Sequence, residues 1–367
     1  MRWQGLRIAL VGPLPPPAGG MAVQTRQLAD LLAGEGVAVT IVQVNAPYSP
    51  AWIGHVKGLR AIARLVPYLR RLWRDCAGMN LVHVMANSGW SWHLYAAPAV
   101  WIARLRGVPV VVNYRGGEAA SFLERSVRWV RPSLEAASLL AVPSDFLRGV
   151  FRQHDIDAYV LPNIVDLSRF RFALRAPNDA PHLVITRNLE GIYDIPTALE
   201  AFARVLRTFP KARLSIAGSG PERSNLEARI AALGIAQSVS FAGKLDRDQV
   251  AALYRDADFM LNPSRVDNMP NSVLEALACG LPVVSTRAGG VPHIVKDGVS
   301  ALLVDVGDAE GMAAAVVRLV RDADLRRRIV EAGFADVQEY TWARVSERLG
   351  ELYARVLPAN LVRMTAA

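Results

Sequence analysis

The sequence predicts an α/β protein made of two successive Rossmann-like domains. The chain has 367 residues, which is long for one domain and natural for two. Short apolar runs alternate with amphipathic stretches, a pattern typical of parallel sheets that helices cover on both faces. A polar, proline-containing segment from residue 162 to about 181 separates one alternating series from the next, so we expect a domain boundary there.

The first series starts near the amino terminus. The continuous apolar run at residues 6–11 predicts a buried strand, and residues 24–33 have the spacing of a helix. Short apolar runs continue the pattern, and they predict further strands at residues 37–44, 81–85, 108–112, 139–142 and 159–161.

The second series opens with a predicted strand at residues 182–186 and an amphipathic helix at 195–208. Ligands of open α/β sheets bind beyond the carboxyl ends of the strands, so polar residues there are the site candidates. Arg187 and residues 264–271 both follow predicted strands. The remaining strands are predicted at residues 212–217, 239–241, 258–261, 283–285 and 301–304, and the helices at 226–233, 249–255 and two closing stretches.

Composition narrows the class of protein. Two cysteines, Cys76 and Cys279, give neither a disulfide framework nor metal-ligand spacing, which fits a reducing compartment. The apolar run at the amino terminus is about seven residues long, which favours a strand over a signal peptide. Nowhere do about 18 uncharged apolar residues follow one another. We therefore expect a cytoplasmic protein. The six histidines lack ligand spacing, so we expect no metal.

The positive charge lies in the first half of the chain. Residues 1–180 hold 20 Lys and Arg against 11 Asp and Glu, whereas residues 181–367 hold 22 of each. Such asymmetry favours an anionic partner, namely a membrane surface, a lipid diphosphate or nucleic acid. Ordinary solubilising charge is the alternative.

An acidic pair near residue 267 is the most informative feature. Asp267 and Glu275 are eight positions apart, and Asn271 is expected to cap a helix that begins between them. A carboxylate on a helix that faces a sheet is costly without a partner, and a ligand with vicinal hydroxyls would supply one. The flanking segments are Asn262-Pro263-Ser264, Leu274-Glu275-Ala276 and Cys279-Gly280-Leu281-Pro282.

This cluster resembles the acidic motif of the family 4 glycosyltransferases. The resemblance extends over most of the chain and implies a GT-B fold, with two Rossmann-like domains facing each other across a cleft. It also implies a UDP- or GDP-sugar as co-substrate, no metal cofactor, and transfer with retention at the anomeric carbon. We expect an acceptor-side domain at residues 1–180, a nucleotide-sugar-binding domain at 181–340, and a helix at 341–367 that packs back toward the first domain.

The resemblance assigns roles in the second domain. Glu275 would hold the ribose hydroxyls, Asp267 and the following loop the transferred sugar, and Arg187 the donor diphosphate. The family has a Lys about five residues after this Arg, but Ile192 or Tyr193 stands there in this chain. Arg265 or Lys244 could substitute. The predicted donor-binding residues are Glu275, Gly19, Gly20, Gly218, Lys244, Asn268, Met269, Pro270 and Asn271.

In the first domain, Gly19 and Gly20 form a loop that would close over the diphosphate. Arg115 stands where the family commonly has a His, and an Arg cannot act as a general base. It remains a candidate for binding phosphate or sugar, so the predicted catalytic residues are Asp267, Arg187 and Arg115. Gly116, Gly117 and Glu118 are placed on the acceptor side.

Residues 55–76 form a basic amphipathic pattern that Pro67 should break or kink. A helix of this type either lies on an anionic membrane or packs its apolar side on the sheet, and both can hold together. Its basic residues are Lys57, Arg60, Arg64, Arg70, Arg71 and Arg74, and its apolar side carries Leu59, Ile62, Leu65, Val66, Leu69, Leu72 and Trp73.

The sequence thus predicts a retaining hexosyltransferase of bacterial cell-surface polysaccharide or glycolipid assembly, with a lipid-linked saccharide as a candidate acceptor. Front-face transfer assisted by the leaving phosphate is the expected chemistry. A non-catalytic GT-B protein with a degenerate donor site and a nucleotide-sugar 2-epimerase are the alternatives. A nucleic-acid partner ranks last, because no basic-aromatic module is present.

Overall fold

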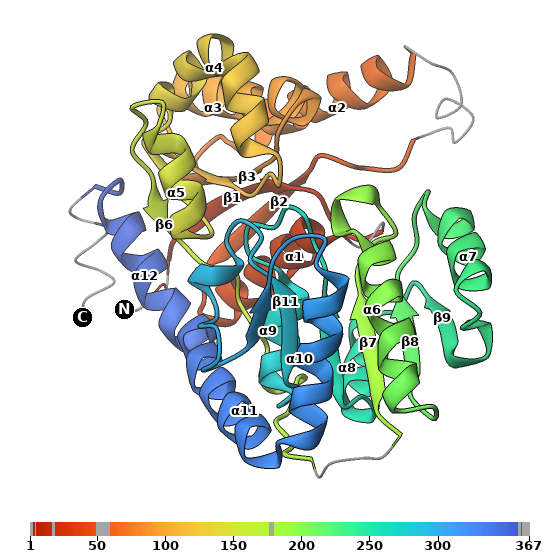
Figure 1. The fold of residues 1–367 in the computed structure, drawn as a ribbon. Helices are drawn as coiled ribbons and strands as arrows, with labels where there is room; N and C mark the ends of the chain where they lie inside the picture. The colour runs from red at the N-terminus through yellow and green to blue at the C-terminus, as the bar shows by residue number, and fades with distance from the viewer. Residues whose placement is uncertain are drawn as a thin grey trace. The chain divides into compact units, whose positions relative to one another are not determined.

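The computed structural model describes residues 3, 5–16, 19–48, 59–175, 180–358 and 361. The chain divides into two compact units (Figure 1). Unit 1 comprises Met1–Ile164 and Trp342–Ala367, and unit 2 comprises Val165–Thr341. Each unit is an α/β domain with a six-stranded sheet, which confirms the predicted pair of Rossmann-like domains.

The sheet of unit 1 has the strand order β2-β1-β3-β4-β5-β6, and all neighbouring pairs are parallel. The order reverses between β1 and β3, so the loops after these two strands lie at a topological switch point. The strands are β1 (Arg7–Gly12), β2 (Ala38–Gln43), β3 (Leu81–Ala86), β4 (Val110–Tyr114), β5 (Leu139–Val142) and β6 (Tyr159–Val160).

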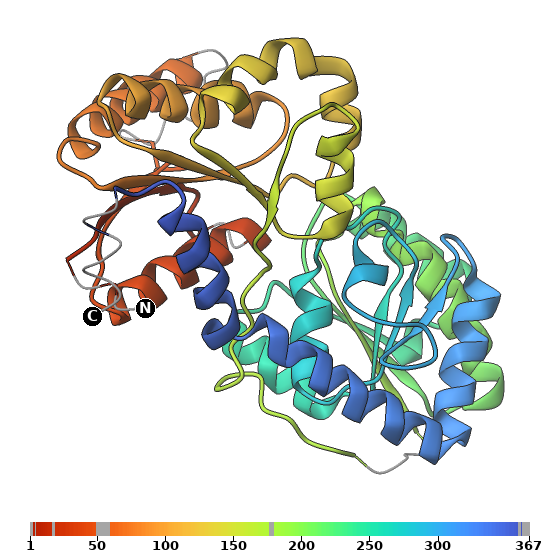
Figure 2. The ribbon, with the colours of Figure 1, turned by 90° about the vertical axis from the view of Figure 1, so that its left-hand side faces the viewer.

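Helices cover both faces of this sheet (Figure 2). One face packs against α1 (Gly20–Gly34) and α12 (Trp342–Ala354), whose Leu349 and Tyr353 are buried in the core beside β1 and β3. The last described helix therefore belongs to unit 1, although unit 2 precedes it in the chain. The other face carries α2 (Leu59–Asp75), α3 (Ala97–Leu105), α4 (Ala119–Ala136) and α5 (Asp145–Arg152), with a π-helical turn, η2 (Trp92–Ala96), before α3.

Helix α2 corrects the predicted break at Pro67. It continues through this residue, which is exposed. A proline leaves the carbonyl four residues earlier without its helical donor, and on an exposed side water can bond such a group. Leu65, Leu69 and Leu72 pack in the core, whereas Val66 and Trp73, predicted on the same side, are 39% and 48% exposed, so that prediction is wrong for these two residues. The predicted residues 55–58 lie outside the described part of the chain, and membrane contact through this segment stays a prediction.

The sheet of unit 2 has the order β12-β11-β10-β7-β8-β9, again with parallel pairs. The order reverses between β7 and β10, which makes the carboxyl ends of these strands the second switch point. The strands are β7 (His182–Thr186), β8 (Arg213–Ala217), β9 (Val239–Gly243), β10 (Phe259–Asn262), β11 (Val283–Thr286) and β12 (Leu302–Val304).

Two clusters of buried hydrophobic side chains form the core of unit 2. One includes residues of α6 (Ile195–Thr208), α7 (Arg223–Ala232) and α10 (Ala309–Arg321), and the other includes residues of α8 (Arg247–Asp256) and α9 (Asn271–Ala278). Helix α11 (Ala323–Val337) contributes to both. Short 3-10 turns are η3 (Gly191–Tyr193), η4 (Ala236–Ser238), η5 (Val291–His293) and η6 (Gln338–Tyr340). Among the described helices, none is long and apolar enough to cross a membrane.

Candidate functional site

The switch point of unit 2 brings two predicted catalytic residues together. Arg187 follows β7, and Asn262 ends the neighbouring strand β10. The Arg187 Nε donates to Asn262 Oδ1 at 2.9 Å, and its Nη2 pairs with the Asp267 carboxylate. In the sequence, Asn262 is 75 positions from Arg187 and Asp267 is 80 positions from it. The two contacts leave three of the five guanidinium N–H donors for another ligand.

Both members of this pair are largely removed from water. The side chains of Arg187 and Asp267 are each 10% exposed. Burial lowers the pKa of the Arg187 guanidinium, while the nearby Tyr193, Tyr254 and Glu275 act in the opposite direction. The Tyr193 ring lies 4.8 Å from the guanidinium carbon. A cation in such surroundings interacts more strongly with an anion than it would in water.

The loop that lacks the family's lysine is tied to the acidic cluster. The Arg265 amide donates to the Ile192 carbonyl at 2.8 Å. Its side chain pairs with Asp194 at 3.1 Å, and Asp194 takes a left-handed backbone conformation with φ +43°. Arg265 is therefore engaged within the loop. Lys244, the other suggested substitute, is exposed just after β9.

Helix α9 starts one residue earlier than predicted. Asn271 is its first residue, and Pro270 takes the N-cap position without a side-chain cap. The Pro270 carbonyl accepts from the Val273 amide at 3.1 Å, and its extended backbone redirects the chain into the helix. Asn268 and Met269 are buried, and Met269 is part of the core of unit 2. Met269 thus has a packing role in addition to any contact with a ligand.

Glu275 lies in the second turn of α9 and is partly buried. Burial raises the pKa of its carboxyl to about 7, although Arg247, Arg187 and Arg169 favour the charged form. Burial and charge, and no hydrogen bond, act on this carboxyl, and in the described part of the chain two buried atoms, Arg247 Nε and Ser272 Oγ, have no hydrogen-bond partner. Buried polar groups without partners are costly, so a ligand with hydroxyls would relieve them.

In unit 1, Arg115 sits at the end of a buried hydrogen-bond chain. Its Nε donates to Asn113 Oδ1 at 3.1 Å, and it also bonds Asn163. Asn113 Nδ2 lies 3.1 Å from His83 Nε2, and His83 Nδ1 lies 2.8 Å from the Tyr353 hydroxyl. Since Asn113 must donate to Nε2, the proton of His83 resides on Nδ1. Burial, reinforced by Arg115, lowers the pKa of His83 to about 3, so the ring is neutral.

The predicted glycines of unit 1 differ in what they require. Gly20 opens α1, and an added Cβ at Gly19 or Gly117 would meet nothing within 4 Å. A Cβ at Gly116 would lie 2.3 Å from Ser88 Oγ, so the loops after β3 and β4 need a glycine there. Glu118 precedes α4 and is exposed. Roles of these residues toward an acceptor stay predictions.

Sequence reasoning missed several residues of these clusters. Asn262 appeared only as part of a motif, and nothing in the sequence links Arg247 to Glu275. His83 and Tyr353 are 270 positions apart. Long-range contacts of this kind have no local signal, although the position of Asn262 at a strand end was a usable one.

Two family descriptions match most of the residues of these clusters, and Tyr353 lies outside both matches. The description "Glycosyl transferases group 1" matches residues 167–336, and "Glycosyltransferase Family 4" matches residues 18–169. This chain belongs to the group 1, family 4 glycosyltransferases.

Individual relatives agree with that assignment. Glycogen synthase of Mycobacterium tuberculosis is 27% identical over 95% of this chain and 94% of its own length. A lipopolysaccharide core biosynthesis glycosyltransferase, LpsE of Rhizobium meliloti, is 36% identical over 44% of this chain and 46% of its own. The structure of Anabaena HepE in complex with UDP and glucose superposes with a TM-score of 0.72 at 19% identity, covering 95% and 99% of the two chains. The fold of this glycosyltransferase is therefore GT-B.

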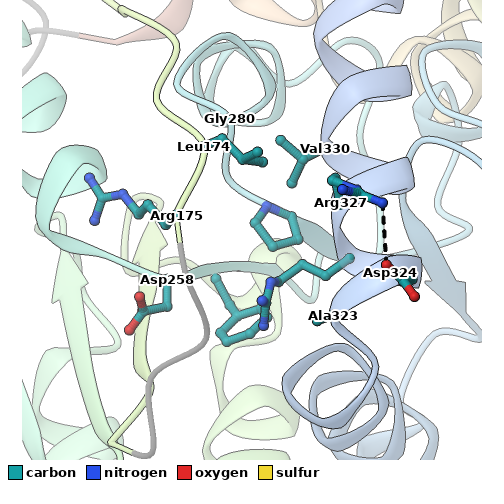
Figure 3. A pocket seen from close by; sticks show the side chains of 11 residues that line it. Leu174, Arg175, Asp258, Gly280, Ala323, Asp324, Arg327 and Val330 are labelled. Carbon is teal, nitrogen blue, oxygen red and sulfur yellow. Dashed lines mark hydrogen bonds and ion pairs between the residues drawn. The ribbon is translucent and has the colours of Figure 1, made fainter.

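A pocket of unit 2 lies away from these clusters. Its lining includes Asp258 and Phe259 at the start of β10, and Pro282 just before β11 (Figure 3). Arg327 pairs with Asp324 at its rim, at 3.3 Å. The pocket is thus at the amino end of the strands, opposite to the edge where Arg187 lies, and none of the predicted site residues lines it.

The close packing of Gly218, which follows β8, leads to a prediction about the free energy of unfolding. A Cβ at Gly218 would lie 1.9 Å from the Arg187 carbonyl oxygen, and the Gly218 amide donates to the Gly243 carbonyl at 2.7 Å. Gly218→Ala should lower the free energy of unfolding by about 2 kcal/mol or more, because the backbone of the Arg187 loop must move. Denaturant titration measures this. Gly191→Ala is the control, since a Cβ there meets nothing within 4 Å; an equal loss in both variants would contradict the argument.

The buried hydrogen bonds of His83 in unit 1 lead to a second prediction about stability. Tyr353→Phe removes the hydroxyl that accepts the His83 Nδ1–H and should lower the free energy of unfolding of this glycosyltransferase by about 1–3 kcal/mol. Tyr159→Phe is the matched control, because the Tyr159 hydroxyl makes only an exposed contact of 3.3 Å with Arg355. Thermal denaturation of both variants measures the effect. A Tyr353→Phe protein as stable as the control would show that the His83–Tyr353 hydrogen bond contributes little to the stability.

Proposed function

We propose that this glycosyltransferase moves a hexose from a UDP- or GDP-sugar to an acceptor hydroxyl with retention. The observation that carries the proposal is the cluster at the switch point of unit 2, where Arg187, Asp267 and Glu275 lie at one edge of the sheet. A cation with spare donors and an ionisable carboxyl on a helix suit the two ends of a nucleoside diphosphate.

Each residue has a distinct role in this proposal. Arg187 binds the donor diphosphate and offsets the charge that develops on the leaving group. Asp267 and the loop through Asn271 position the transferred sugar. Glu275 accepts hydrogen bonds from the ribose hydroxyls. Lys244, exposed beside the Gly218 turn, is a candidate for part of the missing lysine's charge.

The transfer needs no carboxylate nucleophile in this scheme. The acceptor hydroxyl attacks the anomeric carbon from the side on which the diphosphate leaves, and a phosphate oxygen takes its proton. The new glycosidic bond then has the configuration of the donor. Arg115 and the Gly116–Gly117 loop of unit 1 are proposed to bind the acceptor or the phosphate.

A lipid-linked saccharide of cell-surface polysaccharide or glycolipid assembly is the proposed acceptor. The likeness to LpsE supports this class, and so does the positive charge of the first half of the chain, which suits an acceptor that carries a lipid diphosphate.

A thermal-shift screen against UDP, GDP, ADP, CMP and their common sugar conjugates tests the donor. We expect stabilisation by one nucleotide family, lost in Glu275→Ala. Proton NMR of the glycosylated product tests retention, and an inverted anomer would refute it. No stabilisation by any nucleotide would favour a degenerate donor site, which the missing lysine also suggests. Conversion of UDP-N-acetylglucosamine without an acceptor would point to an epimerase.

A further inference from the structure

The helices α2, α3 and α4 of unit 1 share an unusual outer surface. They lie side by side on one face of the sheet, where α3 packs between the other two (Figure 1). Three tryptophans on these helices are turned to solvent. Trp73 on α2 is 48% exposed, Trp101 on α3 is 42% exposed, and Trp129 on α4 is 81% exposed. Leu105, at the end of α3, is 74% exposed.

Helical spacing shows that these residues form one outward face. On α3, Ala99, Val100 and Ala103 are buried, whereas Trp101, Arg104 and Leu105 are exposed. The other two helices repeat this arrangement, because each buries an apolar stripe and exposes a tryptophan with arginines. We give the name tryptophan face to ten of the exposed residues, which are Arg70, Trp73, Arg74, Trp101, Arg104, Leu105, Arg106, Arg125, Arg128 and Trp129.

The tryptophan face is strongly basic. It holds six arginines, whereas the acids with exposed side chains on the described parts of these helices are Glu124 and Glu135. Glu135 lies 3.3 Å from Arg131, and the less exposed Asp75 is paired with Arg71 and Arg74. The guanidinium of Arg106 stacks on the Trp73 ring at 4.9 Å, which joins the end of α3 to α2.

From these observations, we propose that the tryptophan face docks on the surface of a bilayer that contains anionic lipid. Tryptophan prefers the boundary between water and hydrocarbon, and arginine can keep its charge among the headgroups while its stem lies against apolar surface. Anionic headgroups complement the net charge of this face. The contact uses the outer sides of three helices and not Leu65, Leu69 and Leu72 of α2, which already pack in the core.

Two other occupants, a second copy of the chain and nucleic acid, fit the tryptophan face less well. A second copy docking through the same face would bring arginines against arginines, which is unfavourable. Nucleic acid would satisfy the arginines but would leave Leu105 and the rings of Trp101 and Trp129 without an apolar environment. This inference is independent of which sugar is transferred, and it holds even if the proposed donor chemistry fails.

Vesicle flotation of the full chain tests the proposal. We expect the wild-type protein to float with phosphatidylcholine vesicles that contain 30 mol% phosphatidylglycerol, and not with pure phosphatidylcholine. Each arginine near an anionic surface contributes about a fivefold change in partitioning. The double variants Trp101→Ser/Trp129→Ser and Arg125→Gln/Arg128→Gln should therefore both bind at least about tenfold more weakly.

The matched control is Arg318→Gln/Arg321→Gln, which removes two exposed charges from the last turn of α10 in unit 2. This variant should bind within about twofold of the wild type. Equal flotation of all variants, or equal flotation with both vesicle types, would overturn the proposal. So would self-association abolished by Trp101→Ser/Trp129→Ser, or binding to duplex DNA without flotation, since these assign the face to a second copy or to nucleic acid.

A second measurement does not depend on the folding of the tryptophan variants. A solvatochromic dye on Arg128→Cys should shift to the blue when anionic vesicles are added, whereas the same dye on Arg318→Cys should not. The native Cys76 and Cys279 are buried, so the introduced thiol is the reactive one. A dye at position 128 that stays in water would refute docking through this face.

Discussion

Replacing Arg187 by methionine should lower kcat/KM by about 10²–10³-fold. The guanidinium is the cation proposed to meet the leaving diphosphate, and its burial strengthens that interaction. Arg187→Lys should recover only part of the activity, because an ammonium keeps the charge without the planar fork. Steady-state kinetics with the donor identified by thermal shift measures both variants.

The same change should also destabilise unit 2. Removing Arg187 leaves the Asp267 carboxylate largely buried without its ion-pair partner, which costs about 3–5 kcal/mol. Arg187→Met/Asp267→Asn removes the stranded charge, so it should regain much of the stability while its activity stays low. A double variant that regains activity would show that Arg187 acts only by holding the fold.

Arg265→Met is the matched control for this experiment. Arg265 also pairs with a carboxylate, that of Asp194, but its side chain is 62% exposed. Asp194 itself is 3% exposed, but the Thr197 hydroxyl still donates to it at 2.9 Å, so the loss of stability should be smaller than for Arg187→Met. A loss of activity as large as that of Arg187→Met would instead assign the missing lysine's role to Arg265.

Replacing Glu275 by glutamine should weaken nucleotide binding about 10- to 100-fold at pH 8, because a hydrogen bond to a charged group is stronger than one to a neutral group. The wild-type affinity should rise between pH 5.5 and 8. The pKa of about 7 leaves much of the free carboxyl protonated at the lower pH, and binding through ribose hydroxyls favours the ionised form. Calorimetry with UDP and with GDP, titrated separately, measures both effects.

The stability of the nucleotide-free protein should depend on pH in the opposite direction to its affinity for nucleotide. The folded-state pKa of Glu275 is raised from 4.5 to about 7, so the native protein holds a proton that the unfolded chain releases between these values. Its contribution to the free energy of unfolding therefore falls as pH rises through this window. Glu275→Gln should lack that loss and should be more stable than the wild type at pH 8, by about 3 kcal/mol.

Glu310→Gln is the control for titration, because Glu310 is an exposed carboxylate in the first turn of α10. It should leave nucleotide binding and its pH dependence unchanged. Wild-type affinity that does not vary with pH, or a Glu275→Gln protein that binds like the wild type, would remove Glu275 from the ribose site.

Local patterns in the sequence determined much of this protein. Apolar runs followed by helical spacing were enough to predict both α/β series, because a buried parallel strand is apolar throughout and a covering helix is amphipathic. The acidic pair and its flanking segments indicated the family, since these residues are close together in the chain. Arg187 could be singled out because it directly follows a strand.

Tertiary structure alone decided the contacts that give these residues their chemistry. Arg187 meets Asp267 because β7 and β10 are neighbours at the switch point, a pairing that strand order fixes and local sequence does not. Tyr353 reaches His83 only because α12 packs on the sheet of unit 1.

Helix α2 shows that the sequence also leaves open what covers each side of an amphipathic helix. Its amphipathic pattern allowed either the sheet or a membrane to cover its apolar side, because periodicity reports two faces and does not identify what covers each. The structure assigns Leu65, Leu69 and Leu72 to the core but exposes Trp73, which the same periodicity placed with them. Sequence periodicity therefore indicates roughly which residues share a face, whereas packing between distant segments determines which of them are buried and what the others meet.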